Sequence, residues 1–286
     1  MYSVPRTVYS IPPHLTLAPS HMPHLYLLGY PLTHSRSPEI QNAALREAGL
    51  HDWRYELLPT PSADLPQAVA RLRQADCAGG NVTIPHKEAI IPLLDALTPA
   101  AQAIGAVNTL FKREGQLWGD NTDAEGFWLD LQHAFGNLLP GEALLLGAGG
   151  AARAVAYALS RRGWHVTIAA RRVEQAENLC RDLAPAMDGA LRPLALDALQ
   201  SAIVNRQSAL LIVNCTPLGM YPHVETSPWP PEIPFLAGAR LYDLVYNPEE
   251  TRLMQQARAA GLPAINGLGM LHAQAALAFR RWTDDG

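Results

Sequence analysis

The spacing of apolar residues predicts an alternating series of strands and helices in the first half of the chain. The apolar run LYLLG predicts a strand, and Ser37-Pro38 predicts the start of a helix that Gly49 ends in a left-handed conformation. Next come WRYELLP, which alternates as a strand, and LPQAVARLRQA, which repeats at the helical period. GGNVTIP predicts a strand leading into a helix over HKEAIIPLLDAL, and Glu114-Gly115 joins GAVNTLFKR to QLWGD as a hairpin. The first half is therefore predicted to be an α/β domain.

The second half shows the pattern of a parallel, doubly wound sheet of the Rossmann type. In EALLLGAGGAARAVAYALSRRGWHVTIAARR, an apolar strand, a glycine turn, a helix ended by Gly163 and a second strand follow one another. Strands at ALLIVN and RLYDLVY and helices at ETRLMQQARAAG and MLHAQAALAFRRW continue the alternation. Gly267 and Gly269 precede the last helix, and they are predicted to act as a hinge that lets this helix return to the first domain.

The length of 286 residues suits two domains, since single domains usually hold roughly 100 to 200 residues. Residues 1–23 contain several prolines and no apolar periodicity, so they are predicted to form a flexible extension. We expect residues 24–123 and 268–286 to form one domain and residues 124–267 to form the other.

Composition narrows the classes of partner. The 22 basic and 26 acidic residues give a net charge of -4, which provides no field that would attract nucleic acid or an anionic membrane. The three cysteines lie far apart, and the histidines are scattered singly, so we expect a reducing compartment and no metal site. The chain shows no long apolar span and no signal peptide. We therefore expect a cytoplasmic protein that binds neither nucleic acid nor a membrane.

A glycine turn gives the strongest local motif. Gly147, Gly149 and Ala152 match G-x-G-x-x-G/A directly after an apolar strand and directly before a helix. The glycines permit a tight turn, while the free N–H groups and positive end of the following helix attract a pyrophosphate. The alternative is a packing turn that binds nothing, but packing alone does not require the whole spacing.

The residues after the second strand of this unit favour NADP over NAD. NAD enzymes commonly carry an acidic residue about 20 positions after the glycine turn, where it holds the ribose 2′-hydroxyl. Here this place is occupied by Ala169, Ala170, Arg171 and Arg172. Two guanidinium groups suit a 2′-phosphate, which a carboxylate would repel. The alternative is that either arginine is a solvated residue at a helix start.

Lys87 is the most informative residue of the first half. It lies two positions after Pro85, in the expected first helical turn, where the helix dipole disfavours a cation and so favours proton transfer. Asn81 and Thr83 alternate along the preceding strand and are expected to face one side. A surface lysine beside outward-facing strand residues explains the same pattern.

Four further polar residues are ambiguous from the sequence alone. Asp123 ends GDNTD before a helical stretch and suits a helix N-cap. Asn108 interrupts an apolar run, where its amide needs a ligand or backbone partners. Ser37 before Pro38 suits a helix cap, whereas Ser35 has no such structural role, and hydroxyls at a helix start suit a carboxylate ligand.

Taken together, these segments resemble the shikimate dehydrogenase family from about Gly29 to the last helix. The matching segments occur in the family's order: HSRSP, NVTIPHK, GAVNT, GDNTDAEG, LLGAGGAARA, NCTPLGM, DLVYNPEET and NGLGMLHAQAALAF. Two positions depart from the family's pattern, Ala124 and Ala170, where a glycine and an asparagine are usual. The change at Ala170 removes one hydrogen-bond donor, so selectivity for NADP would depend more on Arg171 and Arg172.

The resemblance implies a reaction and its catalytic residues. The reaction is the reversible, NADPH-dependent reduction of 3-dehydroshikimate to shikimate, in the chorismate pathway of aromatic amino acid biosynthesis. Lys87 and Asp123 would carry catalysis, with the lysine exchanging the proton of the substrate hydroxyl and the aspartate holding the lysine charge. Ser35 and Ser37 would bind the substrate carboxylate. Four residues would surround the ring: Thr83, Asn108, Tyr246 and Gln274.

The resemblance also implies that residues 24–123 and 268–286 form a substrate-binding domain and that residues 124–267 form a Rossmann domain with a site for NADP(H). Its expected residues come from the glycine turn and from segments that follow later strands: Gly147, Ala148, Gly149, Gly150, Ala151, Arg171, Arg172, Asn214, Thr216, Gly219, Gly267 and Met270. The alternative functions are a shikimate and quinate dehydrogenase of broader specificity, a two-domain dehydrogenase acting on a folate, and an NADPH-binding regulator without turnover. The paired serines argue against the folate enzyme, and Lys87 with Asp123 argues against the regulator. Monomer and homodimer both remain open.

Overall fold

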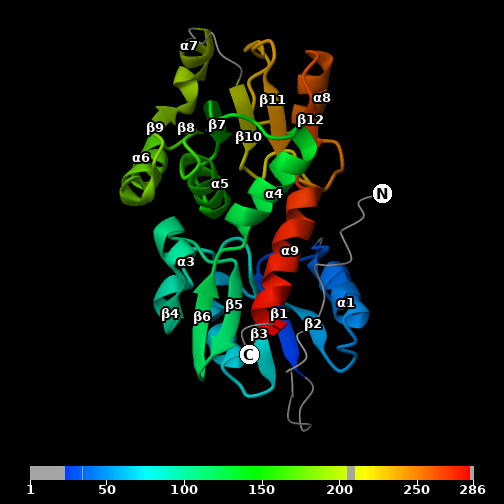
Figure 1. The fold of residues 1–286 in the computed structure, drawn as a ribbon. Coiled ribbons are helices and arrows are strands. Elements are labelled where there is room, and N and C mark those ends of the chain that lie inside the picture. The colour runs from blue at the N-terminus through cyan, green and yellow to red at the C-terminus, as the bar shows by residue number, and fades with distance from the viewer. Residues whose placement is uncertain (1–22, 34, 205–209, 284–286) are drawn as a thin grey trace. The chain divides into compact units, whose positions relative to one another are not determined.

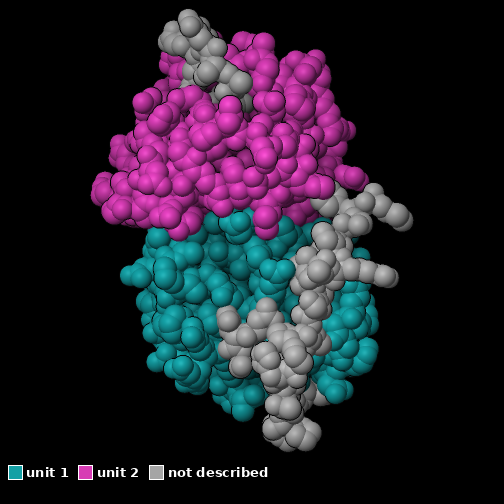
Figure 2. All heavy atoms as spheres, in the orientation of Figure 1, with its two compact units in different colours: residues 1–126, 271–286 teal, residues 127–270 magenta. Residues whose placement is uncertain are grey.

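The computed structural model describes residues 23–33, 35–204 and 210–283. The chain divides into two compact units, coloured separately in Figure 2. Unit 1 contains the described residues up to Gly126 and those from Leu271 onward, and unit 2 runs from Phe127 to Met270. Of the expected extension, residues 1–22 lie outside the described residues. The assignment of substrate and nucleotide to the two expected domains remains a prediction.

Unit 1 is built on a mixed sheet of six strands (Figure 1). Its elements in chain order are β1 (His24–Gly29), α1 (Ser37–Glu47), β2 (Arg54–Pro59), α2 (Leu65–Leu72), β3 (Cys77–Val82), β4 (Ala96–Leu97), α3 (Pro99–Ile104), β5 (Thr109–Arg113), β6 (Gln116–Asp120) and the start of α4 (Asp123–Phe135). The strand order is β2-β1-β3-β5-β6-β4. The strands β1, β2 and β3 pair in parallel, whereas β5 is antiparallel to both β3 and β6.

Helices cover both faces of this sheet, as the apolar runs require. Along β1, Leu25 and Leu27 pack with residues of α1 and of α9 (Leu268–Thr283). Tyr26 and Leu28, which point to the opposite face, pack with α2. The predicted hairpin is confirmed, because Glu114 and Gly115 between β5 and β6 have φ of 52° and 76°. Two positive φ values in a two-residue turn match the twist of the flanking strands.

The helix expected over HKEAIIPLLDAL is not formed. These residues instead form turns, a 3-10 helical turn at Ile91–Leu93 and the short strand β4. Pro92 explains the difference, since a proline inside an α-helix lacks an N–H and clashes with the carbonyl four residues earlier. Lys87 therefore does not lie in the first turn of an α-helix, and the helix-dipole argument for its chemistry was wrong.

The start of α1 also differs from the prediction. The helix begins at Ser37 itself, and Arg36 holds the N-cap position without a side-chain capping bond. The backbone N–H of Ser37 donates to Oγ of Ser35 at 3.3 Å. Ser35 therefore has the structural role that was assigned to Ser37. The end of the helix matches the prediction, with Gly49 at a φ of 76°.

Unit 2 is built on a sheet of six parallel strands in the order β12-β11-β10-β7-β8-β9. Its elements are the rest of α4, β7 (Glu142–Leu146), α5 (Gly150–Ser160), β8 (His165–Ala170), α6 (Val173–Leu183), β9 (Leu191–Ala195), α7 (Leu199–Val204), β10 (Leu210–Asn214), β11 (Arg240–Asp243), α8 (Arg252–Ala259), β12 (Ala264–Asn266) and the start of α9. The strands β7, β8 and β9 extend the sheet in one direction, and β10, β11 and β12 extend it in the other. In Rossmann-type sheets, ligands bind at the carboxyl ends of the strands where this direction reverses, which here are β7 and β10. The predicted doubly wound fold is confirmed.

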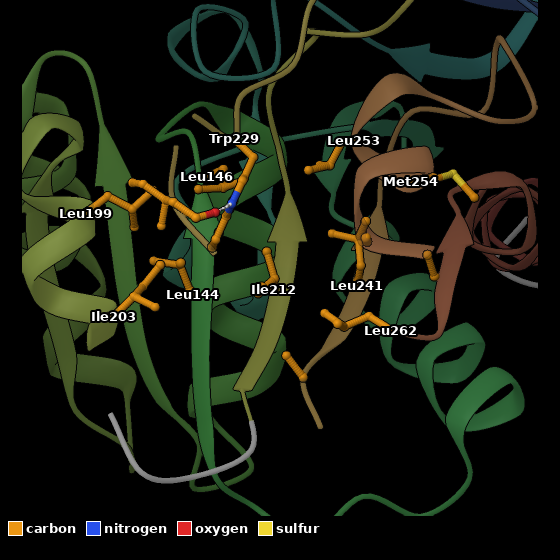
Figure 3. Packing of buried hydrophobic residues seen from close by; sticks show 14 of the residues in the cluster. Leu144, Leu146, Leu199, Ile203, Ile212, Trp229, Leu241, Leu253, Met254 and Leu262 are labelled. Carbon is orange, nitrogen blue, oxygen red and sulfur yellow. Dashed lines mark hydrogen bonds between the residues drawn. The ribbon is translucent and has the colours of Figure 1, made fainter. Parts of the chain in front are cut away.

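A buried apolar cluster fixes one face of this sheet (Figure 3). Leu144, Ile212 and Leu241 contribute from three neighbouring strands, and residues of α7 and α8 cover them. Trp229 packs in the same cluster, and its indole N–H donates to the carbonyl of Ile233 at 2.8 Å. Because the polar atom of the tryptophan is paired, the ring is buried without an unsatisfied donor.

The last helix returns to the first unit as predicted. From Leu271 onward α9 belongs to unit 1, where the indole N–H of Trp282 donates to the carbonyl of Leu110 at 2.9 Å. Gly269, however, lies inside this helix and not in a hinge before it. A Cβ at Gly269 would collide with the carboxylate of Asp130, so close packing explains this glycine.

Candidate functional site

Lys87 and Asp123 form a largely buried ion pair in unit 1. Nζ of Lys87 lies 2.5 Å from Oδ2 of Asp123, and the two side chains are 16% and 7% exposed. Asp123 is the first residue of α4, where the positive end of the helix dipole also stabilises a carboxylate. The pair places an ammonium donor and a carboxylate acceptor side by side, as a proton-transfer site requires.

Asn108 holds the second oxygen of this carboxylate. Its Nδ2 donates to Oδ1 of Asp123 at 2.8 Å and also lies 3.3 Å from Oε1 of Gln274. On the other side of the amide, the N–H of Thr122 donates to Oδ1 of Asn108 at 2.8 Å, and Oγ1 of Thr109 donates to it at 2.9 Å. The orientation of the Asn108 amide is therefore set by the surrounding donors, and this fixes Asp123 beside Lys87.

The buried network continues from Asn108 to the start of α1. Nδ2 of Asn81 donates to the carbonyl of Asn108 at 3.0 Å, and the phenol of Tyr55 donates to Oδ1 of Asn81 at 2.8 Å. Burial raises the pKa of the Tyr55 phenol, and a hydrogen bond with the Ser37 hydroxyl partly offsets this effect. One chain of hydrogen bonds thus links the predicted carboxylate-binding serine to the Lys87–Asp123 pair.

The mixed topology explains why these distant residues meet. Thr109 on β5 lies opposite Asn81 on β3 and opposite Asp120 on β6. Because β5 is antiparallel to both neighbours, its beginning lies at the edge where β3 and β6 end. Lys87 follows β3 and Asp123 follows β6, so both come to this edge. The N–H of Val107 donates to the carbonyl of Lys87 at 2.7 Å, which fixes the backbone of the lysine there.

The glycine turn of unit 2 has the geometry of a phosphate-binding turn. Gly147 has a φ of 105°, and a Cβ there would lie 2.9 Å from Cγ2 of Thr216. Gly149 precedes α5, is exposed, and has open space where a Cβ would lie. Ala152 is fully buried in the first turn of the helix. Backbone N–H groups at the start of α5 are therefore accessible to an anion.

The two arginines lie where β8 gives way to α6. Arg171 and Arg172 are both exposed, and Arg172 occupies the N-cap position of α6 without a side-chain capping bond. Both residues thus lie at the carboxyl end of β8, which pairs with β7, the strand that precedes the glycine turn. A 2′-phosphate contact and a solvated helix-start residue both fit this placement.

The segment after β10 places Thr216 beside the glycine turn, but buries Asn214. Asn214 is 0% exposed, and its Oδ1 accepts hydrogen bonds from N and Oγ1 of Thr216 at 2.9 and 2.7 Å. Gly219 has a φ of 89°, and its N–H donates to Oγ1 of Thr226 at 2.8 Å. Asn214 therefore shapes this loop from inside, and its expected contribution to a cofactor site is through Thr216.

Comparisons with known proteins decide the family. The sequence model described as shikimate dehydrogenase substrate binding domain matches residues 27–110. The shikimate dehydrogenase (NADP(+)) of Salinibacter ruber is 48% identical over 265 residues, which are 91% of this chain and 92% of that protein. The chain belongs to the shikimate dehydrogenase family.

Solved structures share the shikimate dehydrogenase fold. Shikimate 5-dehydrogenase from Thermus thermophilus, in complex with NADP(H) and shikimate, is 41% identical with a TM-score of 0.79, covering 92% of this chain and 94% of that one. Quinate dehydrogenase from Corynebacterium glutamicum, in complex with NAD, is 30% identical with a TM-score of 0.80, covering 93% and 95%. Because proteins with different named substrates and cofactors share this fold, specificity has to be argued from residues.

The helix cap at α4 is one feature that the shikimate dehydrogenase motifs did not reveal. Asp123 was expected to suit an N-cap, but its carboxylate faces Lys87 and Asn108. Oδ1 of Asn121 instead accepts from the N–H of Ala124 at 3.3 Å. The carboxylate of Asp123 therefore does not cap the helix. The signal was present in GDNTD, where a second capping residue precedes the aspartate.

Two of the expected ring-binding residues, Thr83 and Tyr246, belong to different units. Thr83 follows β3 and is half-buried, and its Cγ2 would collide with a Cβ at Gly29. The glycine at the end of β1 therefore makes room for Thr83. Tyr246 belongs to unit 2, where it follows β11, so its place beside a substrate ring stays a prediction. Gly267 and Met270 are buried in the same unit.

Metal and membrane sites have no structural indication in the described part of the chain. Within residues 23–33, 35–204 and 210–283, His, Cys, Asp and Glu side chains form no group of three or more that is arranged to hold a metal ion. None of the helices described in these ranges is long and apolar enough to cross a membrane.

Proposed function

We propose that this chain catalyses the reversible NADPH-dependent reduction of 3-dehydroshikimate to shikimate. The observation that carries the proposal is the Lys87–Asp123 pair, which is held by Asn108 inside a continuous polar network. The printed name of the Salinibacter ruber relative, shikimate dehydrogenase (NADP(+)), supports the substrate and the cofactor. A quinate-accepting enzyme is not favoured, because the quinate dehydrogenase is 30% identical whereas this relative is 48% identical.

Lys87 is the proton donor in the reducing direction. Its ammonium gives a proton to the C3 carbonyl oxygen as the carbon receives hydride, which NADPH supplies when bound. In the oxidising direction the neutral lysine takes the proton of the C3 hydroxyl. Asp123 holds the ammonium in place, and its carboxylate can also accept a hydrogen bond from a ring hydroxyl. The low exposure of both side chains strengthens their electrostatic effect on the developing alkoxide.

The remaining network residues orient the substrate. Ser35 and Ser37 at the start of α1 bind the carboxylate. Ser37 lies at one end of the hydrogen-bonded chain and Lys87 at the other, so the carboxylate and the C3 carbonyl of the substrate are held at opposite ends of this chain. Asn108, Gln274 and Thr83 contact ring hydroxyls, and Tyr246 is the fourth ring-binding residue of the proposal. Each of these side chains offers a hydroxyl or an amide, which suits a polyhydroxylated ring.

Unit 2 has residues that fit NADP(H). The turn at residues 147–151 has no side chain where a pyrophosphate would approach Gly149, and the N-terminus of α5 supplies N–H donors. Arg171 and Arg172 bind the 2′-phosphate. Thr216, Gly219, Gly267 and Met270 line the nicotinamide end, and the buried Asn214 contributes to it through Thr216.

Replacing Lys87 tests this function. In Lys87→Ala we expect kcat for shikimate oxidation to fall by about 10²- to 10⁴-fold, because the proton-transfer group is lost. NADPH affinity, measured by fluorescence titration, should stay within about twofold, since Lys87 lies in unit 1 and the cofactor residues are in unit 2. Lys112→Ala is the matched control, because Lys112 binds the carbonyls of Arg73 and Gln74 outside the network. Retained turnover in Lys87→Ala would refute the mechanism.

Specificity is tested by assaying shikimate and quinate, each with NADP+ and NAD+. The highest kcat/KM is expected for shikimate with NADP+. NADPH binding without turnover on any substrate would indicate the regulator, and a preference for quinate would indicate the broader enzyme. We further propose a cytoplasmic location, and a monomer or homodimer, which sedimentation would distinguish.

A further inference from the structure

We propose that Asp243 is a positioning residue for the cofactor site and acts through Asn214. The inference rests on the proposed NADP(H) binding by unit 2 and adds a residue that does not itself touch the cofactor. Asp243 is the last residue of β11, and it lies in register with the last residues of both neighbouring strands, Asn214 of β10 and Asn266 of β12. It therefore lies at the carboxyl edge of the sheet, where ligands of this fold bind.

The carboxylate of Asp243 joins three separate segments. It is 0% exposed, and its Oδ1 accepts hydrogen bonds from Nδ2 of Asn214 at 2.8 Å and from N of Val245 at 3.0 Å. Its Oδ2 accepts from Oγ1 of Thr251 at 2.6 Å. Oγ1 of Thr251 in turn accepts from N of Met254 and caps α8. Asn214 is itself an expected cofactor residue, Val245 directly precedes the expected ring-binding residue Tyr246, and Thr251 caps the helix α8 that follows.

Asp243 holds the NH2 side of the Asn214 amide, together with the carbonyl of Leu218, which accepts from Nδ2 of Asn214 at 3.3 Å. A carboxylate only accepts hydrogen bonds, so the NH2 group of Asn214 must face Asp243. The amide oxygen then faces Thr216, whose N–H and hydroxyl both donate to it. The reversed amide would place an NH2 group against that backbone N–H. Thr216 lies against Gly147 of the glycine turn, so the link reaches the expected pyrophosphate site.

Backbone hydrogen bonds connect the residues after β11 to those at the ends of β10 and β12. The N–H of Leu244 donates to the carbonyl of Asn214 at 3.0 Å, and the N–H of Gly267 donates to the carbonyl of Val245 at 3.3 Å. A Cβ at Gly267 would collide with the carbonyl of Leu244, so this backbone contact requires glycine. Asp243 thus connects the segments that carry Thr216, Tyr246 and Gly267.

Burial of this carboxylate carries an energetic cost that needs a reason. Burial raises the pKa of Asp243 to about 6, although hydrogen bonds from Thr251, Val245 and Asn214 oppose the shift. An uncharged residue of similar size would avoid the cost of desolvation. Positioning provides the reason, because the two oxygens of the carboxylate together accept from Asn214, Val245 and Thr251.

The test measures NADPH affinity in a double-mutant cycle. We expect Asp243→Ala and Asn214→Ala each to raise the Kd for NADPH by about tenfold, because a buried hydrogen bond to a charged group is lost. In the double variant the Kd should rise no further than in either single variant, as expected for residues acting in one link. The KM for shikimate at saturating NADP+ should change by less than about twofold. Asp243→Asn keeps one accepting oxygen for Asn214 and should recover most of the affinity.

Ser160→Ala is the control. Ser160 is a fully buried residue of unit 2 whose hydroxyl donates to the carbonyl of Gly189, so its loss reports a general decrease in stability. Additive effects in the cycle, equal losses for cofactor and substrate, or an unchanged Kd would each overturn the proposal. If Asp243→Ala does not fold, Asn214→Ala tests the same link, and unchanged affinity there overturns it. A native chain that does not bind NADPH would refute the proposed function instead.

Discussion

Nζ of Lys87 lies 2.5 Å from one oxygen of Asp123, and the other oxygen accepts a hydrogen bond from Asn108. Each carboxylate oxygen therefore has its own partner, and the ion pair is oriented as well as close. An isolated pair with low exposure would gain little in stability, because desolvation offsets the attraction. The additional hydrogen bond from Asn108 makes the arrangement a defined position for a proton donor.

Asp123→Asn is expected to lower kcat by about 10²-fold, with a smaller effect on KM for NADP+. The substitution keeps the shape of the side chain but removes the charge that holds the Lys87 ammonium, and an amide NH2 group cannot accept from it. Steady-state kinetics with shikimate and NADP+ check this prediction. Asp95→Asn is the control, because Asp95 pairs with Arg73 at the surface of unit 1. Equal losses in both variants would contradict the role of Asp123.

Local sequence patterns could not predict that Lys87 and Asp123 lie close together. The two residues are 36 positions apart, and an antiparallel strand between β3 and β6 brings them to one edge. Local patterns predict elements but do not specify which strands pair. The resemblance to a family supplied the pair, whereas the local argument for Lys87 failed because Pro92 prevents the expected helix.

Tyr55→Phe tests the buried network on the substrate side. Tyr55 is 2% exposed, and removing its hydroxyl leaves Oδ1 of Asn81 without this donor. We expect the free energy of unfolding to fall by about 1 to 3 kcal/mol, as for other buried groups that lose a partner. We also expect KM for shikimate to rise by about fivefold, because Ser37 loses its phenol partner.

Tyr26→Phe provides the matched comparison. Tyr26 lies on the opposite face of the same sheet, and its hydroxyl accepts a hydrogen bond from Arg71 at 2.7 Å. Urea unfolding and substrate kinetics should show decreased stability in both variants but a changed KM only in Tyr55→Phe. A KM that is the same in both would show that the Tyr55 hydroxyl serves the fold alone.

Arg171 and Arg172 are expected to determine cofactor preference. In the double variant with alanine at both positions, KM for NADPH should rise by about tenfold or more, whereas KM for NADH and for the substrate should change little. Both side chains are exposed, so the free energy of unfolding should change by less than about 0.5 kcal/mol. Arg181→Ala on α6 is the control, since this arginine bonds Asn178 on its own helix. Equal increases in KM for NADPH and NADH would contradict contact with a 2′-phosphate.

Some site features were recognisable in the sequence, and others depended on the completed fold. The glycine turn was predictable because Gly147 requires a positive φ and Ala152 a small side chain, both of which follow from the motif. Asp243 was overlooked inside the apolar strand RLYDLVY, where a charged residue is itself a signal of a buried role. Its partners Asn214 and Thr251 come from different segments, so the sequence did not indicate which residues it holds.

The raised pKa of Asp243 predicts how its contribution to stability depends on pH. In the folded chain this pKa is about 6, compared with 3.8 for an unperturbed carboxyl. Between these values the folded state binds the proton more tightly than the unfolded state, so stability from this group decreases as pH rises through the interval. The difference corresponds to about 3 kcal/mol, lost between about pH 4 and about pH 6 and constant above that range.

Asp243→Asn removes this titration while keeping the size of the side chain. Urea unfolding of both proteins from about pH 4 to about pH 7 should therefore show the variant gaining stability relative to the native chain by about 3 kcal/mol as pH rises. Burial and the charge of Asp243 both raise the pKa of the Cys215 thiol, so this thiol stays protonated throughout the range. Other carboxyl groups are common to both proteins and cancel in the difference. A constant difference across the range would show that Asp243 titrates alike in the folded and unfolded chains, and its three hydrogen bonds would then fully offset the cost of burial.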